Sequence, residues 1–244
     1  MILYLHGSGY AICSSRTHRG LTSQLSSRTG IPVFSLDYRL APEHRHPAAL
    51  EDARAAWDWL RAQGYSAEQI VVAGDSAGGH LSLLLALDLA RTGQPLPASL
   101  VTLSPLIDMD LAGARVRDQM SRDPFTHPRL ARRVLKLYAD DSQRADLNRR
   151  LFFDDVAGFP PTLIHNGSAE MLSADCTELA RRMRRAGLEV QHRVWPGQMH
   201  VFQALTAVVP ESHRALDEVA DFIGRGLSEC RRPMDLPSGE VQSA

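Results

Sequence analysis

The sequence predicts one domain of the α/β class, in which helices pack on a mainly parallel β-sheet. Short apolar runs rich in β-branched residues alternate with longer segments of helical period, the pattern of successive βα units. The chain has 244 residues, of which 44% are hydrophobic and 23% charged, a composition typical of globular proteins. Because single α/β domains commonly reach ~250 residues, we expect one domain over residues 1–230.

Six apolar runs are predicted as strands, and each is bounded by Gly, Pro, Asp or Ser, which favour turns. The first and third run directly into glycine-rich turns. In chain order the predicted strands are Ile2–Leu5, Pro32–Leu36, Ile70–Ala73, Leu100–Leu103, Thr162–His165 and Glu189–Val194.

Between and after these strands, five segments carry apolar residues at helical spacing. In order, the predicted helices are Thr17–Arg28, Ala48–Ala62, Ala77–Arg91, Ala174–Ala186 and Glu211–Gly226. Residues 231–244 hold two prolines, one glycine and few apolar residues, so we expect a disordered tail there.

Residues 115–159 interrupt the alternation with charged sequence that favours helices. This segment lies between the strand that ends near residue 104 and the strand that begins near residue 162, and Leu130–Tyr138 is its clearest helix. Insertions at this end of a sheet often carry function as lids. We therefore expect residues 115–159 to form a lid-like insertion.

Charge and cysteine usage narrow the classes of partner and compartment. Lys and Arg together number 27 and Asp and Glu 28, so no overall positive charge attracts nucleic acid, and we expect no such partner. The three cysteines, Cys13, Cys176 and Cys230, form no C-x-x-C pair and suggest neither a disulfide framework nor a zinc site. No apolar run approaches the ~20 residues that span a bilayer. We expect a cytoplasmic protein without a transmembrane segment.

The segment Gly74–Gly79, with the sequence GDSAGG, indicates nucleophilic catalysis by a serine. It directly follows a predicted strand and opens a predicted apolar helix, the context in which a G-x-S-x-G nucleophile elbow occurs. In such a strained turn the glycines leave room that a Cβ would fill, and the hydroxyl of Ser76 projects above the sheet. Ser76 is therefore the candidate nucleophile.

A serine hydroxyl needs a neighbouring base to take its proton, and His200 is the candidate among the ten histidines. It lies in a short loop between the last predicted strand and the last predicted helix, where the chain order nucleophile, acid, histidine places it. His165 ends an apolar strand and is expected to be a hydrogen-bonded core residue.

Three carboxylates compete to orient that imidazole and to stabilise its charged form. Glu170 follows the strand Thr162–His165 and is the preferred candidate. Asp108 follows the preceding strand and is the next choice. Asp175 begins a predicted helix, where an N-terminal capping role is the plainer explanation.

The turn after the first strand, with the sequence HGSG, suits an oxyanion hole built from backbone N–H groups. Its members would be Gly7, Ser8 and Gly9, joined by Ala77 after the nucleophile. Small residues let this backbone approach a substrate. We expect the N–H groups of Ser8, Gly9 and Ala77 to be the donors.

Four segments together resemble the hormone-sensitive-lipase-like branch of the α/β-hydrolases: His6–Tyr10, Asp37–Glu43 with Pro47 beyond it, Gly74–Gly79, and Pro196–Phe202. The resemblance spans residues 2 to about 224 and implies an α/β-hydrolase three-layer sandwich. It also implies a carboxylesterase that needs no metal or cofactor and acts on small acyl esters through an acyl-enzyme. An acetylated metabolite or a small lactone is an alternative substrate.

Two alternatives of another class follow from the same resemblance. Some members of this family bind small molecules without catalysis and lack the histidine, whereas His200 is present here. The second alternative is an inactive fragment, because the family pattern has two further strands and a helical cap before the first motif, and we expect both to be missing here. The substrate pocket around Tyr10, Met199 and Phe202 would then be open to water and would favour a homodimer.

Overall fold

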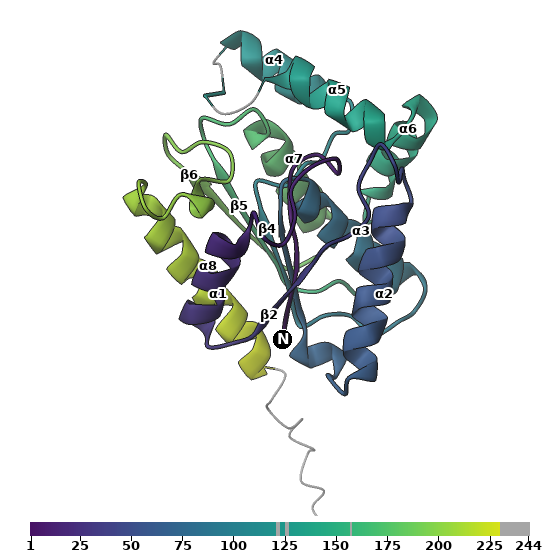
Figure 1. The fold of residues 1–244 in the computed structure, drawn as a ribbon, viewed down its shortest axis with the longest axis vertical. Helices are drawn as coiled ribbons and strands as arrows, with labels where there is room; N and C mark the ends of the chain where they lie inside the picture. Colours follow the sequence, from purple (N-terminus) through teal and green to yellow (C-terminus); the bar gives the residue numbers. More distant parts are fainter. Residues whose placement is uncertain (121–122, 125–126, 157, 230–244) are drawn as a thin grey trace, which may run out of the picture.

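Six parallel strands form the sheet, in the order β2-β1-β3-β4-β5-β6 (Figure 1). The computed structural model describes residues 1–120, 123–124, 127–156 and 158–229, so the predicted tail at 231–244 lies outside the described residues. The parallel α/β architecture and all six predicted strands are confirmed. The strands are β1 (Ile2–Leu5), β2 (Val33–Leu36), β3 (Val71–Asp75), β4 (Ser99–Leu103), β5 (Thr162–Gly167) and β6 (Val190–Trp195).

The register of the central strands brings two glycine-rich turns together. Leu5 at the end of β1 lies opposite Gly74 of β3, and Asp75 at the end of β3 lies opposite Leu103 of β4. Because all strands are parallel, the turns that follow them emerge at one edge of the sheet, its carboxyl edge. The turn after β1 and the turn after β3 are therefore neighbours.

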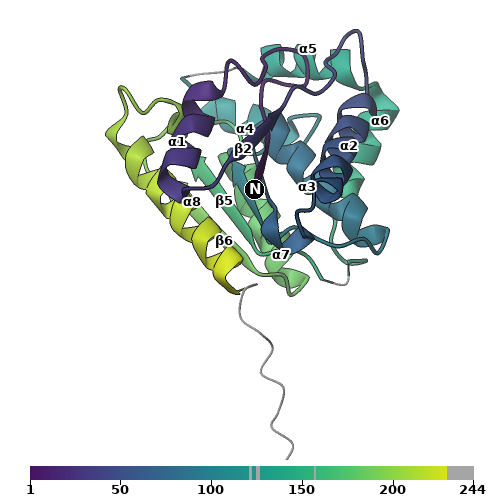
Figure 2. The same ribbon diagram turned by 60° about the horizontal axis from the view of Figure 1, so that its bottom comes forward.

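Helices cover both faces of the sheet and complete three layers (Figure 2). Alternate residues of β1 pack into the two interfaces: Leu3 and Leu5 belong to one apolar cluster, and Ile2 and Tyr4 to the other. The first cluster includes α2 (Ala48–Ala62), α3 (Ala77–Arg91) and α7 (Ser173–Arg185), and the second α1 (Arg19–Thr29) and α8 (Pro210–Glu229). The predicted bounds of α2 and α3 match these, and the other three helices shift by at most three residues.

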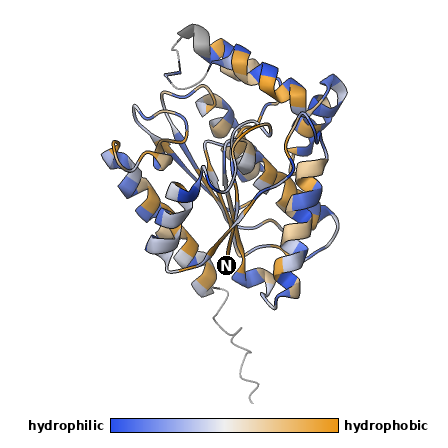
Figure 3. Cartoon of the chain, viewed as in Figure 1, coloured by the Kyte–Doolittle hydropathy of each residue, from blue (hydrophilic) through white to orange (hydrophobic). Residues whose placement is uncertain are grey.

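Three more helices, α4 (Ala112–Met120), α5 (Pro128–Tyr138) and α6 (Asp141–Arg150), lie over the carboxyl edge of the sheet (Figure 1). They occupy most of the predicted insertion at 115–159, although α4 begins three residues earlier, at Ala112. Residues 121–122, 125–126 and 157 lie outside the described part. Hydrophobic and hydrophilic residues alternate along α5 (Figure 3). Two short 3₁₀ helices, Ala67–Gln69 and Phe202–Ala204, complete the elements of the described residues.

A buried arginine ties these upper helices to one another. The side chain of Arg144 is 2% exposed, and its Nε donates to Asp110 at 3.1 Å. Its other nitrogens donate to the carbonyl of Ala139 at 2.9 Å and to the carboxylate of Asp141 at 2.5 Å. One guanidinium therefore joins the loop before α4, the end of α5 and the start of α6.

We expect Arg144→Ala to lower the free energy of unfolding by about 2–4 kcal/mol, because it removes three hydrogen bonds and leaves the carbonyl of Ala139 without its buried donor. Arg149→Ala is the matched control on the same helix, since Arg149 is 68% exposed and its ion pair with Asp146 is 3.6 Å long. That variant is expected to stay within about 0.5 kcal/mol of wild type. Urea denaturation measures both, and equal values would contradict the role given to Arg144.

Candidate active site

Ser76 occupies the turn between β3 and α3 in a strained backbone conformation, with φ 51° and ψ −118°. Hydrogen bonds fix the turn from both sides: the N–H of Ser76 donates to Leu103 at 2.9 Å, and its carbonyl accepts from Leu106 at 3.0 Å and His80 at 3.1 Å. The side chain is thereby held at the carboxyl edge of the sheet. This is the geometry of a nucleophile elbow.

The two glycines of the elbow are required by close backbone approach. A Cβ on Gly78 would lie 1.9 Å from the carbonyl oxygen of Leu5, and a Cβ on Gly74 would lie 2.5 Å from the carbonyl oxygen of Gly78. No side chain fits at those distances. The start of α3 therefore rests directly on the end of β1.

His200 meets Ser76 from the loop that follows β6. Its Nε2 lies 3.0 Å from Oγ of Ser76, and the side chain is 8% exposed. The backbone N–H of the next residue, Val201, donates to Oγ of Ser104 at 3.1 Å and fixes this loop. The predicted nucleophile and base are thus within hydrogen-bond distance, although 124 residues separate them.

Glu170 stands behind His200 and is fully buried. Its Oε2 lies 3.7 Å from Nδ1 of His200, within ion-pair range. The same oxygen accepts from Oγ of Ser104 at 2.6 Å and from the N–H of Gly167 at 3.3 Å. A carboxylate on the Nδ1 side favours the tautomer whose proton is on Nδ1, which leaves Nε2 free to accept from Ser76.

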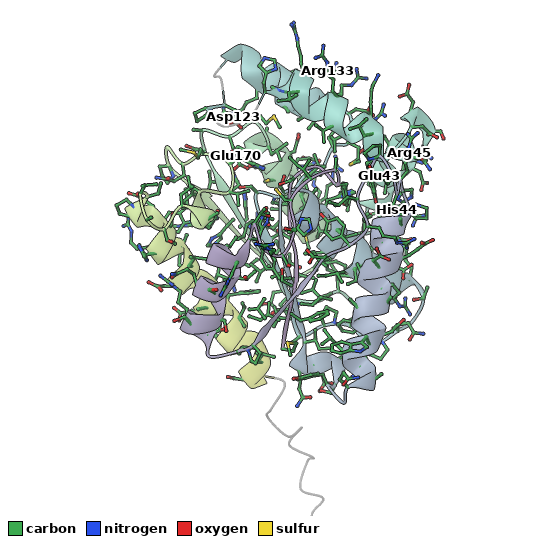
Figure 4. The ribbon with its side chains drawn as sticks, viewed as in Figure 1. Glu43, His44, Arg45, Asp123, Arg133 and Glu170 are labelled. Carbon is green, nitrogen blue, oxygen red and sulfur yellow. The ribbon has the colours of Figure 1, made fainter. Side chains whose placement is uncertain are left out.

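The electrostatic surroundings favour the charged form of His200. Burial alone would lower the pKa of its imidazole, but the contact with the Glu170 carboxylate and the negative charges around the ring oppose burial, and the pKa is raised. Asp123 and Asp75 add to the same shift. Asp123 and Glu170 both lie near the end of the molecule that α4 covers (Figure 4), and Asp123 accepts from the N–H of Met171 at 2.8 Å.

Ser104 is a site residue that the sequence analysis missed. It follows β4, is fully buried, and joins the loop of Glu170 to the loop of His200 through its hydroxyl. Its φ of 49° is unusual for a serine. The available signal was its place after a predicted strand, at the same edge as the other candidates.

The competing carboxylates have other contacts. Asp108 accepts from the N–H groups of Asp110 and Ala112 at 2.9 and 2.6 Å, so it caps the start of α4, and it also accepts from Asn148 at 3.1 Å. Asp175 lies in the first turn of α7, where burial and the charge of Asp108 raise its pKa to about 6. Asp108 thus has a local explanation in helix geometry, whereas the capping role expected for Asp175 is not borne out: its Oδ2 is buried without a hydrogen-bond partner among the described residues.

The turn after β1 lies beside the elbow, but its N–H groups are not equivalent. The N–H of Gly7 donates to the carboxylate of Asp75 at 3.1 Å, so this N–H is already engaged with the end of β3. Ser8 and Gly9 have positive φ values of 87° and 65°. The hydroxyl of Ser8 donates to Sγ of Cys13 at 2.8 Å. Ala77 is the first residue of α3.

The expectation that the apolar surface around Tyr10 and Phe202 is open to water is wrong. Tyr10 is fully buried: its ring stacks on Tyr138 of α5 with centroids 3.9 Å apart, and its hydroxyl lies 2.5 Å from Nδ1 of His80. Phe202 is also fully buried, against Trp195. Met199 is half-buried. The helices above the sheet and α8 cover positions that the sequence analysis left open.

His165 is a core residue, as expected, but the expected hydrogen bond is not formed among the described residues: its Nε2 lies 3.6 Å from Oε2 of Glu218. It is fully buried, and burial lowers the pKa of its imidazole to about 3. Within the residues that the structure describes, no group of three or more His, Cys, Asp or Glu side chains could hold a metal ion. In the same part of the chain, no helix has the length and apolar character needed to cross a membrane.

Comparison with known proteins places this site in a family. The sequence profile of a family described as having the alpha/beta hydrolase fold matches residues 2–204. The carboxylesterase/phospholipase LipF of Mycobacterium tuberculosis is 38% identical over 91% of this chain and 61% of its own length. An acetyl-hydrolase of Streptomyces hygroscopicus is 35% identical over 93% of this chain and 76% of its own length.

Solved structures agree with these sequence matches. The crystal structure of an esterase from the bacterial hormone-sensitive lipase family superposes with a TM-score of 0.87 at 38% identity, over 93% of this chain and 77% of the other. A structure of an esterase/lipase from an uncultured bacterium gives 0.86 at 33% identity, over 93% and 76%. The chain thus spans 61% of the length of LipF.

We expect the imidazole of His200 to titrate above its ordinary pKa of 6.5 in the wild-type protein. Glu170→Gln removes the charge that raises the pKa while burial persists, so this variant should titrate below 6.5. Asp108→Asn is the matched control and should leave the pKa of His200 unchanged. NMR titration of labelled imidazoles measures all three, and an unchanged pKa in Glu170→Gln would contradict the assigned contact.

Proposed function

The chain belongs to the α/β-hydrolase family, in its hormone-sensitive-lipase-like branch, and from this premise we propose that it hydrolyses carboxylic esters with Ser76 as nucleophile. The observation that carries the proposal is the 3.0 Å contact between Ser76 Oγ and His200 Nε2, at a strained turn above the sheet. A serine so placed becomes a nucleophile when this histidine takes its proton.

The reaction proceeds in two halves. In the first, Oγ of Ser76 attacks the acyl carbon while Nε2 of His200 takes the hydroxyl proton; the imidazolium then protonates the departing alcohol, and an acyl-serine remains. In the second, His200 takes a proton from water, the hydroxide attacks the acyl carbon, and the returned proton frees Ser76 with release of the acid. Glu170 holds the imidazole and stabilises its charged form in both halves.

Negative charge develops on the carbonyl oxygen in each tetrahedral intermediate. We assign its stabilisation to the N–H groups of Ser8, Gly9 and Ala77. Gly7 has a different task, since its N–H donates to Asp75. The N-terminal end of α3 adds a favourable dipole at the same position.

We propose small acyl esters as the substrates, with acetylated metabolites or small lactones as alternatives. The acetyl-hydrolase among the relatives supports acyl groups of this size. The buried stack of Tyr10 on Tyr138 fixes α5 over the turn after β1, which supports a lid-like role for helices α4 to α6.

We also propose that the protein is cytoplasmic and forms a homodimer. The unpaired thiols of Cys13 and Cys176 fit the reducing conditions of the cytoplasm. The edge strands β2 and β6 of the sheet each offer one side for pairing, which supports a homodimer.

Ser76→Ala should lower the rate of ester hydrolysis at least ~10³-fold, because it eliminates the covalent path. The fold should remain, since the change deletes one oxygen and leaves the backbone bonds of the turn in place. Hydrolysis of p-nitrophenyl esters from acetate to palmitate measures the loss and the acyl preference together. Turnover in Ser76→Ala comparable with wild type would refute the nucleophile, and a binding protein would show no turnover in either form.

Activity should rise with pH through an apparent pKa above 6.5, because only neutral His200 accepts the proton and its pKa is raised. Glu170→Gln should lower kcat by ~10²–10⁴-fold and move this limb to lower pH, since the lost charge both stabilises and orients the imidazolium. Asp108→Asn is the control and should change kcat less than ~3-fold. The opposite ranking in pH–rate profiles would move the acid to Asp108.

A further inference from the structure

The carboxylate of Asp75 is a buried group beside Ser76 that the proposed chemistry does not use. Its Oδ1 accepts from the hydroxyl of Tyr4 at 2.7 Å and from the N–H of Gly7 at 3.1 Å. Its Oδ2 lies 3.4 Å from Nε2 of His18, and the Asp75 side chain is 4% exposed. A carboxylate this deeply buried is costly unless donors surround it, and here they come from separate segments.

The position of this carboxylate in the chain gives it a geometric consequence. The pairing of β1 with β3 ends at Leu5 and Gly74, so no ladder bond joins the two turns beyond that point. Asp75 immediately precedes Ser76, and Gly7 immediately precedes Ser8. The bond between Asp75 and Gly7 therefore bridges the two turns just before the residues that would act on a substrate.

Gly7 leaves room for this contact because it has no side chain. A Cβ at Gly7 would lie 2.1 Å from Oδ2 of Asp75, so any larger residue would displace the carboxylate. His18 faces the carboxylate from the other side, and its imidazole supplies the opposite charge when it is protonated. Burial alone would lower the pKa of His18, but the hydrogen bond and charge of Asp75 outweigh burial and raise it.

We propose that Asp75 is a positioning residue, which holds the turn of Ser8 and Gly9 at a fixed distance from Ala77 and so sets the geometry of the oxyanion hole. This inference rests on the proposed function. The hole takes donors from two turns, and it stabilises the transition state only when both reach the same oxygen. Misplacement by ~1 Å can cost ~10²-fold in rate.

Asp75→Ala is the direct test. We expect kcat for p-nitrophenyl butyrate to fall ~10–100-fold with KM within ~3-fold, because the donors act on the transition state and not on the bound ester. Affinity for an alkyl trifluoromethyl ketone, which forms a tetrahedral adduct with the serine, should fall by a similar factor. Rates are compared on the pH plateau, since Asp75 also contributes to the raised pKa of His200.

Two further variants separate positioning from packing. Asp75→Asn keeps an oxygen that accepts from Gly7 and an amide that can face neutral His18, so it should restore kcat to within ~5-fold of wild type. Tyr4→Phe removes the other donor to the same Oδ1 and leaves the Gly7 bond, so its kcat should change less than ~3-fold. Thermal denaturation checks that each variant is folded.

Gly7→Ala approaches the contact from the other side. Its Cβ displaces the carboxylate, so it should lower kcat as Asp75→Ala does, and the double variant should be hardly worse than either single one. Folded Asp75→Ala or Gly7→Ala protein with kcat within ~3-fold of wild type would overturn the proposal, as would lost turnover with unchanged ketone affinity. Unfolding of both would show a requirement for folding and would also overturn it.

Failure of the proposed function has a different signature. Wild-type protein that hydrolyses no ester would refute the proposed esterase activity. The positioning of the turn by Asp75 would then be tested by crystallography. In crystals of Asp75→Ala, we expect the backbone of Gly7, Ser8 and Gly9 to move relative to Ala77. An unmoved turn would refute the positioning role whatever the activity.

Discussion

The approach of α3 to the end of β1 is the constraint on which the rest of the site depends. A Cβ on Gly78 would lie only 1.9 Å from the carbonyl oxygen of Leu5. The helix that follows Ser76 therefore packs on the neighbouring strand without an intervening side chain. The strained residue Ser76 leads directly into this helix, and the turn after β1 lies beside it. A nucleophile and its oxyanion donors come together because two backbones touch.

Much of this could be predicted from the sequence because its causes are local. The buried strands β1, β3, β4 and β5 are mainly apolar runs, whereas β2 and β6 at the edges are partly exposed; the predicted bounds of all six lie within two residues of the observed ones. The glycines around Ser76 mark the elbow directly, and His200 and Glu170 follow late strands in the required order. Parallel topology then brings the loops to one edge, so chain order was enough to select the residues that the structure places together.

The remaining contacts could not be predicted, because they join segments that are distant in sequence. Ser104 is 66 residues from Glu170, and Gly7 is 68 residues from Asp75. Nothing in either neighbourhood specifies which hydroxyl or N–H meets the carboxylate. The burial of Tyr10 is of the same kind: helix α5 was predicted, but not the placement of Tyr138 against that ring. Local pattern gives elements, whereas partner choice follows from packing.

Two buried carboxylates, Glu170 and Asp75, flank the serine with different partners. Glu170 acts on an imidazole, where its charge raises the pKa of His200. Asp75 faces an N–H, a phenol and a second imidazole, where its charge holds a turn in place. Buried ion pairs contribute little net stability because desolvation offsets their attraction, so their value lies in geometry. One carboxylate orients the base and the other orients the backbone, and catalysis requires both to be correctly placed around the same acyl group.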